Sequence, residues 1–279
     1  MFIIGTALIQ KVEGRDAGSV CGIALVSGKL YVLHYADKDQ IDIYSVPDLV
    51  RLDALSVPAR KDDLWDITSC AVHKCLYVSN KGERCLLRMK VEDEQTRRVK
   101  WTKWRVGKSP FGLSIIQANC NILVTCRVDG CLIQLDPQGN TVPESCIHPL
   151  HAFQLDDGNY LVSHGYARNS THRVCKVTPK GKEIGSYGGT KGGGPDKLNE
   201  PCHMALERNG LYVADFNNGR MVKLNPALLF VRNVTRDVKG RDKETGHRFQ
   251  RLCLDYESKK LYIGDYIGNV TIINIKSGR

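Results

Sequence analysis

Several features that mark other classes of protein are missing from this 279-residue sequence. No run of 18 consecutive apolar residues occurs, which excludes a membrane-spanning helix. The apolar start, Phe2 to Ile9, has no basic residue before it, because the first lysine is Lys11, so we expect no secretory signal. No C-x-x-C pair occurs either, and the chain therefore offers no ligand framework for a zinc ribbon or a RING.

Two enzyme motifs are also missing. The glycine-rich run from Gly188 to Gly194 lacks the G-x-x-x-x-G-K-[ST] order of a phosphate-binding loop. Ser114 and Ser163 stand in no G-x-S-x-G context, so nothing supports an acyl-transfer triad. We accordingly predict no catalytic residue and no cofactor.

The 11 cysteines are odd in number and scattered. Several lie within apolar runs, such as Cys175 and Cys253, where a free thiol behaves as a small hydrophobic group. We interpret them as reduced core residues of an intracellular, cytoplasmic protein. Three N-x-[ST] triplets, at Asn169, Asn233 and Asn269, would be N-glycosylation sites only in a secreted chain.

Charge is unbalanced. Lysine and arginine number 40 against 30 aspartate and glutamate, a formal charge of +10. A positive net charge of this size suits an acidic or polyanionic partner, and it also keeps a protein soluble. The charge alone does not distinguish nucleic acid, an acidic protein and simple solubility as its reason.

A three-residue apolar signature recurs six times, and its central residues lie 38 to 51 positions apart. The six copies are Leu30-Tyr31-Val32, Leu76-Tyr77-Val78, Ile122-Leu123-Val124, Tyr160-Leu161-Val162, Leu211-Tyr212-Val213 and Leu261-Tyr262-Ile263. A turn rich in Gly, Asn or Asp precedes most copies, and a further alternating run follows about ten residues later in several of them. These are the marks of short β-strands.

Four short strands per unit, repeated six times, fill the chain. One such sheet cannot bury both of its faces, whereas six packed around an axis bury them and leave only short edges. The sequence therefore predicts an all-β fold: a six-bladed β-propeller of four-stranded antiparallel blades, forming one domain over residues 1–279. The sixth unit stops after its third strand, so we expect the strand-like run from Ile3 to Val12 to close the last blade.

The fifth unit carries a family resemblance. It has a glycine-rich lead-in, the stretch Leu198-Asn199-Glu200-Pro201, the strand Gly210-Leu211-Tyr212-Val213-Ala214-Asp215, and then Asn218-Gly219-Arg220. This order resembles an NHL repeat, and the sixth unit keeps part of it at Leu261 to Asp265. The match is close over about 33 residues, from Gly192 to Leu224, and the first four units keep mainly the apolar skeleton. The resemblance is to the C-terminal NHL propellers of tripartite-motif proteins, and it implies a module that binds RNA or protein and selects targets for ubiquitin ligation.

Alternation of strands within a blade brings the starts of the first strands and the ends of the second strands to one mouth of the channel. We therefore predict a ligand-binding group of polar side chains at this mouth: Asp66, His151, His164, His203, Asp215, Arg251 and Asp265. Histidine with carboxylate could hold a metal, but hydrated polar lining is the alternative, and we predict no metal. Asp215 has another interpretation, in which it pairs with Arg220 and only shapes the turn.

Basic residues gather in the loops predicted to lie on this same face. The residues predicted to bind RNA or an acidic partner are Lys103, Arg105, Lys108, Arg168, Arg173, Arg236, Lys239, Arg241, Lys243 and Arg248. Tyr166, Trp104 and Phe216 could supply stacking planes. A solvated charged rim is the alternative.

From these observations we predict a non-enzymatic, monomeric recognition module that binds an acidic protein segment or single-stranded RNA, with neither DNA nor membrane as partner. The alternative is a metal-dependent hydrolase or lyase of the six-bladed propeller type, with its site at the channel mouth.

Overall fold

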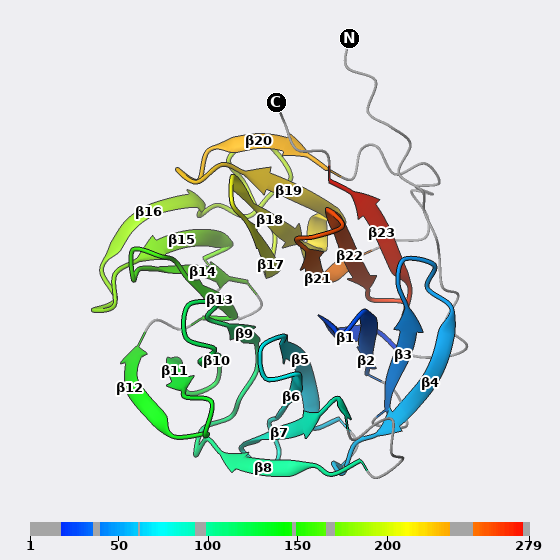
Figure 1. The fold of residues 1–279 in the computed structure, drawn as a ribbon. Coiled ribbons are helices and arrows are strands. Elements are labelled where there is room, and N and C mark those ends of the chain that lie inside the picture. Colours follow the sequence, from blue (N-terminus) through cyan, green and yellow to red (C-terminus); the bar gives the residue numbers. More distant parts are fainter. Residues whose placement is uncertain are drawn as a thin grey trace.

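The protein is described here by a computed structural model, shown in Figure 1. It describes residues 18–35, 40–60, 62–92, 99–146, 149–165, 171–234 and 248–275, without the side chains of 143–146.

Six antiparallel sheets surround a central axis as the blades of a propeller (Figure 1). Blade 1 contains β1 (Val20–Val26), β2 (Lys29–His34), β3 (Gln40–Ser45) and β4 (Arg51–Ser56). Blade 2 contains β5 (Leu64–Cys70), β6 (Cys75–Asn80), β7 (Cys85–Lys90) and β8 (Thr102–Arg105). Blade 3 contains β9 (Leu113–Ile115), β10 (Ile122–Cys126), β11 (Cys131–Leu135) and β12 (Thr141–Cys146).

Blade 4 contains β13 (His151–Gln154), β14 (Tyr160–His164), β15 (Arg173–Val177) and β16 (Glu183–Gly188). Blade 5 contains β17 (Pro201–Glu207), β18 (Gly210–Asp215), the short 3₁₀ helix η1 (Phe216–Asn218), β19 (Arg220–Leu224) and β20 (Phe230–Asn233). Blade 6 contains β21 (Phe249–Asp255), β22 (Lys260–Asp265) and β23 (Val270–Asn274). Within each blade, strand order follows the chain, and Figure 1 shows the first strand nearest the axis.

The recurring apolar signature forms the centre of the second strand of each blade. Tyr31, Tyr77, Tyr212 and Tyr262 occupy its middle position and are fully buried. Every residue of β6 and of β18 is buried, because these strands lie between two hydrogen-bonded neighbours and between two packed blades. The signature is therefore a consequence of burial on both faces of the sheet.

Apolar side chains fill the spaces between blades. Tyr31 and Ile43 of blade 1 pack in one cluster with Leu76 and Leu87 of blade 2. Val32 of blade 1 belongs to a cluster that also contains residues of blade 6. The inner strand β1 contacts both β5 and β21, so the ring is closed between the last blade and the first.

The predicted six-bladed propeller is confirmed, with five four-stranded sheets and a three-stranded sixth sheet in the described part of the chain. The run Ile3 to Val12 lies outside the described residues, and its role in closing the sixth blade stays a prediction. Where the structure describes the chain, it contains no helix long and apolar enough to cross a bilayer.

Buried hydroxyl groups connect neighbouring blades near the axis. Thr125 Oγ1, on β10, donates to the carbonyl oxygen of Leu150 just before β13, at 2.8 Å, and accepts the N–H of Gly112 at 2.8 Å. Ser79 Oγ, on β6, donates to the carbonyl oxygen of Phe111 before β9, at 2.9 Å. Each bond satisfies a backbone group that lies next to the channel mouth.

We expect Thr125→Val to lower the free energy of unfolding by about 1–3 kcal/mol, because the isosteric methyl leaves the Leu150 carbonyl and the Gly112 N–H without partners in a dry interior. Thr102→Val, on the exposed edge strand β8, is the matched control and should change stability by less than about 0.5 kcal/mol. Chemical denaturation measures both. Equal effects of the two substitutions would contradict a specific role for the hydroxyl that joins blades 3 and 4.

Candidate functional site

The start of each inner strand presents two successive residues at one mouth of the channel. In blades 1, 5 and 6, the antiparallel register shifts by one residue at this point, between Val20 and Gly22, between Pro201 and His203, and between Phe249 and Arg251. β5 of blade 2 has a similar irregularity. Such bulges redirect side chains and recur beside binding sites.

The first of the two residues in each blade lines a pocket. These six equivalent residues are Cys21, Trp65, Phe111, Leu150, Cys202 and Gln250. The pocket has a volume of about 500 Å³ and is completed by Gly18, Ser19, Tyr35, Phe216, Tyr266 and Arg251. This is the size and character of a site for a small molecule, since such sites are concave and mostly apolar.

Aromatic rings and cations form the wall of the pocket. The rings of Trp65 and Phe111 are tilted against each other, with centroids 4.5 Å apart. Lys81 Nζ lies 4.9 Å from the Trp65 ring centroid, and the guanidinium of Arg127 lies 5.6 Å from that of Phe111. Across the mouth, the guanidinium of Arg248 lies 5.5 Å from the Phe216 ring centroid. The wall therefore combines flat apolar surfaces with positive charge.

The second residue of each pair builds a buried polar group beneath the pocket. Blades 2, 4, 5 and 6 supply Asp66, His151, His203 and Arg251, all buried. The two imidazole rings lie 3.8 Å apart between centroids. His203 Nε2 is 3.9 Å from Asp66 Oδ2, and Arg251 Nε is 3.6 Å from Asp66 Oδ1. We call these four residues the hub group.

Glycine occupies the equivalent positions of blades 1 and 3, where the next blade approaches closely. A Cβ at Gly22 would lie 2.7 Å from the backbone nitrogen of Ile67, and one at Gly112 would lie 2.7 Å from the carbonyl oxygen of Leu150. Neither position can carry a side chain without moving the backbone of the next blade.

Hydrogen bonds fix the orientation of the hub group. Asp66 accepts the N–H of Ile67 on Oδ1 and the N–H of Leu113 on Oδ2, each at 2.9 Å. Arg251 donates to the carbonyl oxygens of Cys21, of Gln250 at 2.9 Å and of Trp65 at 3.2 Å. Arg251 therefore joins blade 6 to blades 1 and 2 as well as lying in the pocket floor.

Burial shifts the ionisation of the hub group. Desolvation raises the pKa of Asp66 to about 6, against the opposing effect of the Arg251 charge. Desolvation, reinforced by Arg251, lowers the pKa of His151 to about 3. The pKa of His203 is also far below its usual value, from desolvation and from its neighbours His151 and Arg251. At neutral pH the group therefore contains neutral imidazoles, a carboxylate and a guanidinium.

The neutral imidazoles have defined tautomers. His203 Nδ1 accepts the N–H of Leu252 at 3.4 Å, which leaves the proton on Nε2, the nitrogen that faces Asp66. His151 Nε2 lies 3.3 Å from the carbonyl oxygen of Leu113 and carries the proton there, so its Nδ1 keeps a lone pair. This buried Nδ1 makes no hydrogen bond among the described residues.

Asp66, His151 and His203 are close enough for metal binding, since their ligand atoms all lie within 4.8 Å of one another. Their surroundings do not fit a divalent cation. Arg251 places a positive charge beside Asp66, and the nitrogen of His203 that faces Asp66 carries a proton. A metal-bound histidine donates its other N–H to an acceptor, a pattern that His151 follows with the Leu113 carbonyl oxygen but that His203, whose Nδ1 accepts the Leu252 N–H, does not. The hub group is suited to acid–base chemistry.

Sequence reasoning placed Asp66, His151, His203 and Arg251 together, and the structure does bring them together. Two other predicted mouth residues instead shape their own turns. Asp215 accepts hydrogen bonds from Asn199 N, Asn218 Nδ2 and Arg220 Nε at 2.6–2.7 Å.

Asp265 accepts bonds from Ile267 N and from Asn269 N and Nδ2 at 2.8–3.0 Å. His164 Nε2 lies 3.1 Å from Cys175 Sγ within blade 4. These bonds, with those of Asp215, are local, so Asp215, Asp265 and His164 do not join the hub group.

The predicted basic surface is not assembled as expected. Lys103 and Arg105 lie on the outermost strand β8, away from the axis, and Lys103 pairs with Glu83. Arg173 pairs with Glu183 at 2.8 Å within blade 4, while Lys108 is half-buried. Arg168, Arg236, Lys239, Arg241 and Lys243 lie outside the described residues, as does Tyr166.

Of the other two predicted stacking residues, Trp104 packs against Tyr77 of its own blade, with centroids 5.5 Å apart. Phe216 lines the pocket, and Arg248 is the predicted basic residue placed against it.

Sequence reasoning missed most of the pocket wall, including Tyr35, Trp65, Phe111 and Tyr266. The signal was present: Trp65 and Phe111 directly precede the predicted inner-strand starts, and Tyr35 and Tyr266 directly follow second strands. In blades 1, 5 and 6 a bulge, which the repeat pattern does not reveal, lies beside the residue that lines the pocket.

The fold is similar to those of two solved enzymes. Virginiamycin B lyase from Staphylococcus aureus matches with a TM-score of 0.65 and 11% identity, over 96% of this chain and 99% of that one. A streptogramin B lyase matches with a TM-score of 0.61 and 10% identity, over 97% of this chain and 87% of that one. No family model and no curated protein sequence matches the chain. At this identity the likeness establishes the six-bladed propeller architecture.

These comparisons correct the predicted function. The predictions of a non-enzymatic recognition module and of no enzyme activity are contradicted, because the architecture matched over nearly the whole chain is that of lyases. The alternative was a metal-dependent hydrolase or lyase of the six-bladed propeller type with its site at the channel mouth, and the comparisons support its lyase interpretation better than the recognition module. The two predicted partner classes and the cytoplasmic location are untested and stay predictions.

The ionisation of the hub group predicts acid sensitivity. His151 takes up a proton near pH 6.5 in the unfolded chain but only near pH 3 in the folded one, so acid favours unfolding in this interval. Asp66 opposes this between 3.8 and about 6, because its folded carboxyl keeps a proton to higher pH.

The free energy of unfolding should fall less steeply in His151→Gln than in the parent as the pH drops below 6.5. The two slopes should differ by up to about 1.4 kcal/mol per pH unit. Urea denaturation at a series of pH values, with chelator present, measures the difference. His73→Gln, at an exposed turn, is the control. Parallel curves for the parent and His151→Gln would contradict the ionisation assigned to the buried imidazole.

Proposed function

We propose that this chain is an enzyme of the lyase class that acts on a small, largely apolar carbonyl compound bound in the mouth pocket. The observation that carries the proposal is the Arg251 side chain, which lines a pocket with several aromatic residues and lies 3.6 Å from the Asp66 carboxylate. The likeness of the fold to two lyases supports the reaction class.

The pocket wall defines the substrate class. Rings from Trp65, Phe111, Tyr35, Phe216 and Tyr266 offer flat apolar surfaces from several blades. Lys81, Arg127 and Arg248 place positive charge behind these rings, which suits a neutral or anionic substrate better than a cationic one. We therefore expect an aromatic or branched ester or amide.

Arg251 is proposed as the catalytic residue that stabilises negative charge on the carbonyl oxygen. Its cation is held in place by three backbone carbonyls, so little reorganisation is needed when charge develops. In an enclosed site with few polar groups, such a charge acts more strongly than in water.

Asp66 is proposed as the proton acceptor of the site, and His203 as the residue that positions it. Asp66 has a pKa of about 6, in the range useful for proton transfer near neutrality. Its Oδ2 faces the Nε2–H of His203, which is slightly more exposed than Asp66. At neutral pH the carboxylate is therefore the group that can take up a proton, and the His203 N–H holds it in place.

The proposed step is an elimination. The C–H bond next to the carbonyl breaks and its proton passes to the Asp66 carboxylate, and the electron pair left behind forms a carbon–carbon double bond. The bond to the leaving oxygen or nitrogen breaks at the same time, and that atom takes the bonding pair and then the proton held by Asp66. No oxidant or water is consumed.

The lining cysteines do not favour covalent catalysis. Burial raises the pKa of Cys202 to about 12, so it is a neutral thiol at physiological pH and a poor nucleophile. Its Sγ lies 3.3 Å from the carbonyl oxygen of Gln250. Cys21 Sγ in turn donates to the carbonyl oxygen of Leu33 at 3.4 Å.

The test is turnover of virginiamycin B and of a panel of apolar esters and amides with a leaving group β to the carbonyl, followed by mass spectrometry. We expect products whose summed mass equals that of the substrate, whereas a hydrolase adds one water. kcat/KM should rise with pH through about 6, the pKa of Asp66.

Asp66→Asn should remove this rise and lower kcat/KM by about 10²–10⁴-fold. Ile184→Thr, on the outer strand β16, is the matched control and should match the parent. No turnover of any panel member by the folded parent protein would contradict the proposal, and water-added products would replace it with a hydrolase.

We also propose that the blades are NHL-type repeats. The support is the turn of blade 5, where Arg220 bonds to Asp215 and to the carbonyl oxygens of Gly193 and Lys197. These bonds join the glycine-rich lead-in to the strand Gly210–Asp215, the two parts from which the resemblance was drawn.

A further inference from the structure

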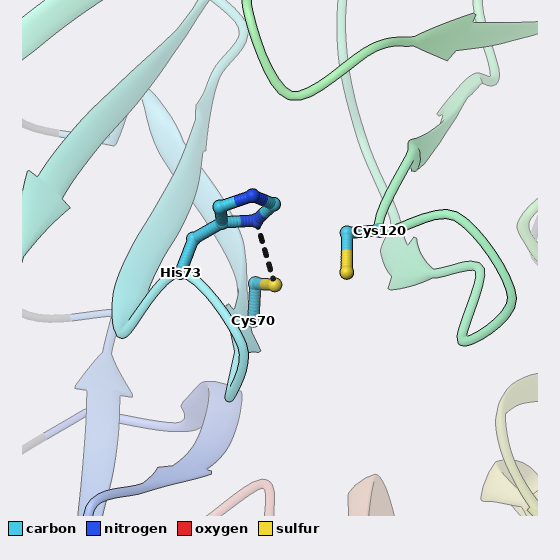
Figure 2. A group of neighbouring side chains, drawn as sticks. All are labelled: Cys70, His73 and Cys120. Carbon is cyan, nitrogen blue, oxygen red and sulfur yellow. Dashed lines mark hydrogen bonds between the residues drawn. The ribbon is translucent and has the colours of Figure 1, made fainter.

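A second cluster of possible metal ligands lies far from the pocket, where two turns of neighbouring blades face each other. Cys70 ends β5, and His73 lies in the turn between β5 and β6 of blade 2. Cys120 lies in the corresponding turn between β9 and β10 of blade 3. Figure 2 shows the three side chains and the two turns that carry them. Because inner strands start at the pocket mouth, the turns at their far ends belong to the opposite face.

The distances suit a single small cation. Cys70 Sγ lies 3.3 Å from His73 Nδ1, and all three ligand atoms lie within 4.8 Å of one another. On a tetrahedral zinc ion, a thiolate sulfur and an imidazole nitrogen lie about 3.5 Å apart and two thiolate sulfurs about 3.8 Å apart, from Zn–S of about 2.3 Å and Zn–N of about 2.0 Å. The sulfur–nitrogen pair therefore already has nearly the required spacing.

The two turns hold their ligands on fixed backbone. Cys120 N donates to the carbonyl oxygen of Ile116 at 2.9 Å, which closes the turn, and Cys120 has a left-handed φ of 59°. The same position of the repeat holds Gly28, Lys74, Gly158 and Lys259, all with positive φ. The backbone conformation at this turn position therefore recurs from blade to blade. Blade 3 has a cysteine here where other blades have a glycine or an exposed lysine.

The surroundings of the cluster also suit a soft metal. Cys70 packs in the apolar cluster that joins blades 2 and 3, and Cys120 packs against it, while His73 is exposed. A cation here would be shielded on the protein side and open to water on the other, with no charged hub group beside it. Two thiolates and one imidazole form a ligand set that prefers zinc over magnesium or calcium.

We propose that Cys70, His73 and Cys120 form a zinc site that joins blades 2 and 3 on the face opposite the pocket, with the fourth position open to water. Binding converts two thiols to thiolates and so releases two protons per zinc ion. The site is independent of the proposed lyase activity.

The test uses the full chain, reduced and stripped of metal, with Zn²⁺ as the probe. We expect one zinc ion per chain by elemental analysis, release of about two protons on binding, and a rise in Tm of a few degrees. With Co²⁺ in place of zinc, a thiolate-to-metal absorption band should appear.

His73→Ala changes an exposed side chain and should leave the fold intact. Loss of a residue that only hydrogen-bonds to a metal ligand lowers metal affinity by roughly 10- to 100-fold, and loss of the ligand His73 should lower zinc affinity by more than this. Cys120→Ala should behave likewise. Cys253→Ala, a half-buried cysteine of blade 6, is the matched control and should bind as the parent does. Asp66→Asn should also bind normally, which separates this site from the hub group.

The proposal is overturned if the reduced parent protein retains no zinc, or if His73→Ala and Cys120→Ala retain as much as the parent. Zinc lost in Asp66→Asn but kept in His73→Ala would place the metal at the hub group instead. Mass spectrometry could instead find the parent protein lighter than its sequence mass by two hydrogens, with the peptides of Cys70 and Cys120 linked. That result would show that these two cysteines form a disulfide in place of a metal site.

Discussion

Packing of six inner strands around one axis is the constraint on which the site depends. Each inner strand contacts its neighbours on both sides, and β1 contacts β21 to complete the ring. Six residues at equivalent positions, up to 229 positions apart in the sequence, are thereby brought to one axis. Four of these positions hold an aspartate, two histidines and an arginine, and the other two, in blades 1 and 3, hold glycine where a Cβ would lie 2.7 Å from the backbone of the next blade.

Meeting on the axis also removes these side chains from water, and that determines their chemistry. The carboxyl of Asp66 keeps its proton to higher pH, while both histidines resist protonation, because each group loses the solvation of its charged form. The bonds of Arg251 to three carbonyl oxygens hold its guanidinium between the buried group and the pocket. Geometry and ionisation therefore have the same cause.

The sequence was sufficient to predict the propeller and four members of the buried group, because the repeat aligns equivalent positions. It could not predict the bulges at Cys21, Cys202 and Gln250, since a shift of one residue leaves the apolar pattern of the strand unchanged. It placed Asp215 and Asp265 at the ends of second strands, where the structure has them, but their carboxylates are used within their own turns. The sequence did not reveal Cys70, His73 and Cys120 as a possible ligand set, because they contain no C-x-x-C pair and Cys120 comes from another blade.

The unequal content of the hub has an evolutionary consequence. Repeats that are alike can be duplicated, deleted or exchanged, because each contacts only its neighbours. Here, Asp66 of blade 2 reaches His203 of blade 5 across the axis, and Arg251 of blade 6 reaches past Gly22 to blade 2. Reordering the blades would preserve every hydrogen-bonded ladder and still disperse this group. The hub group therefore depends on the order of the six units.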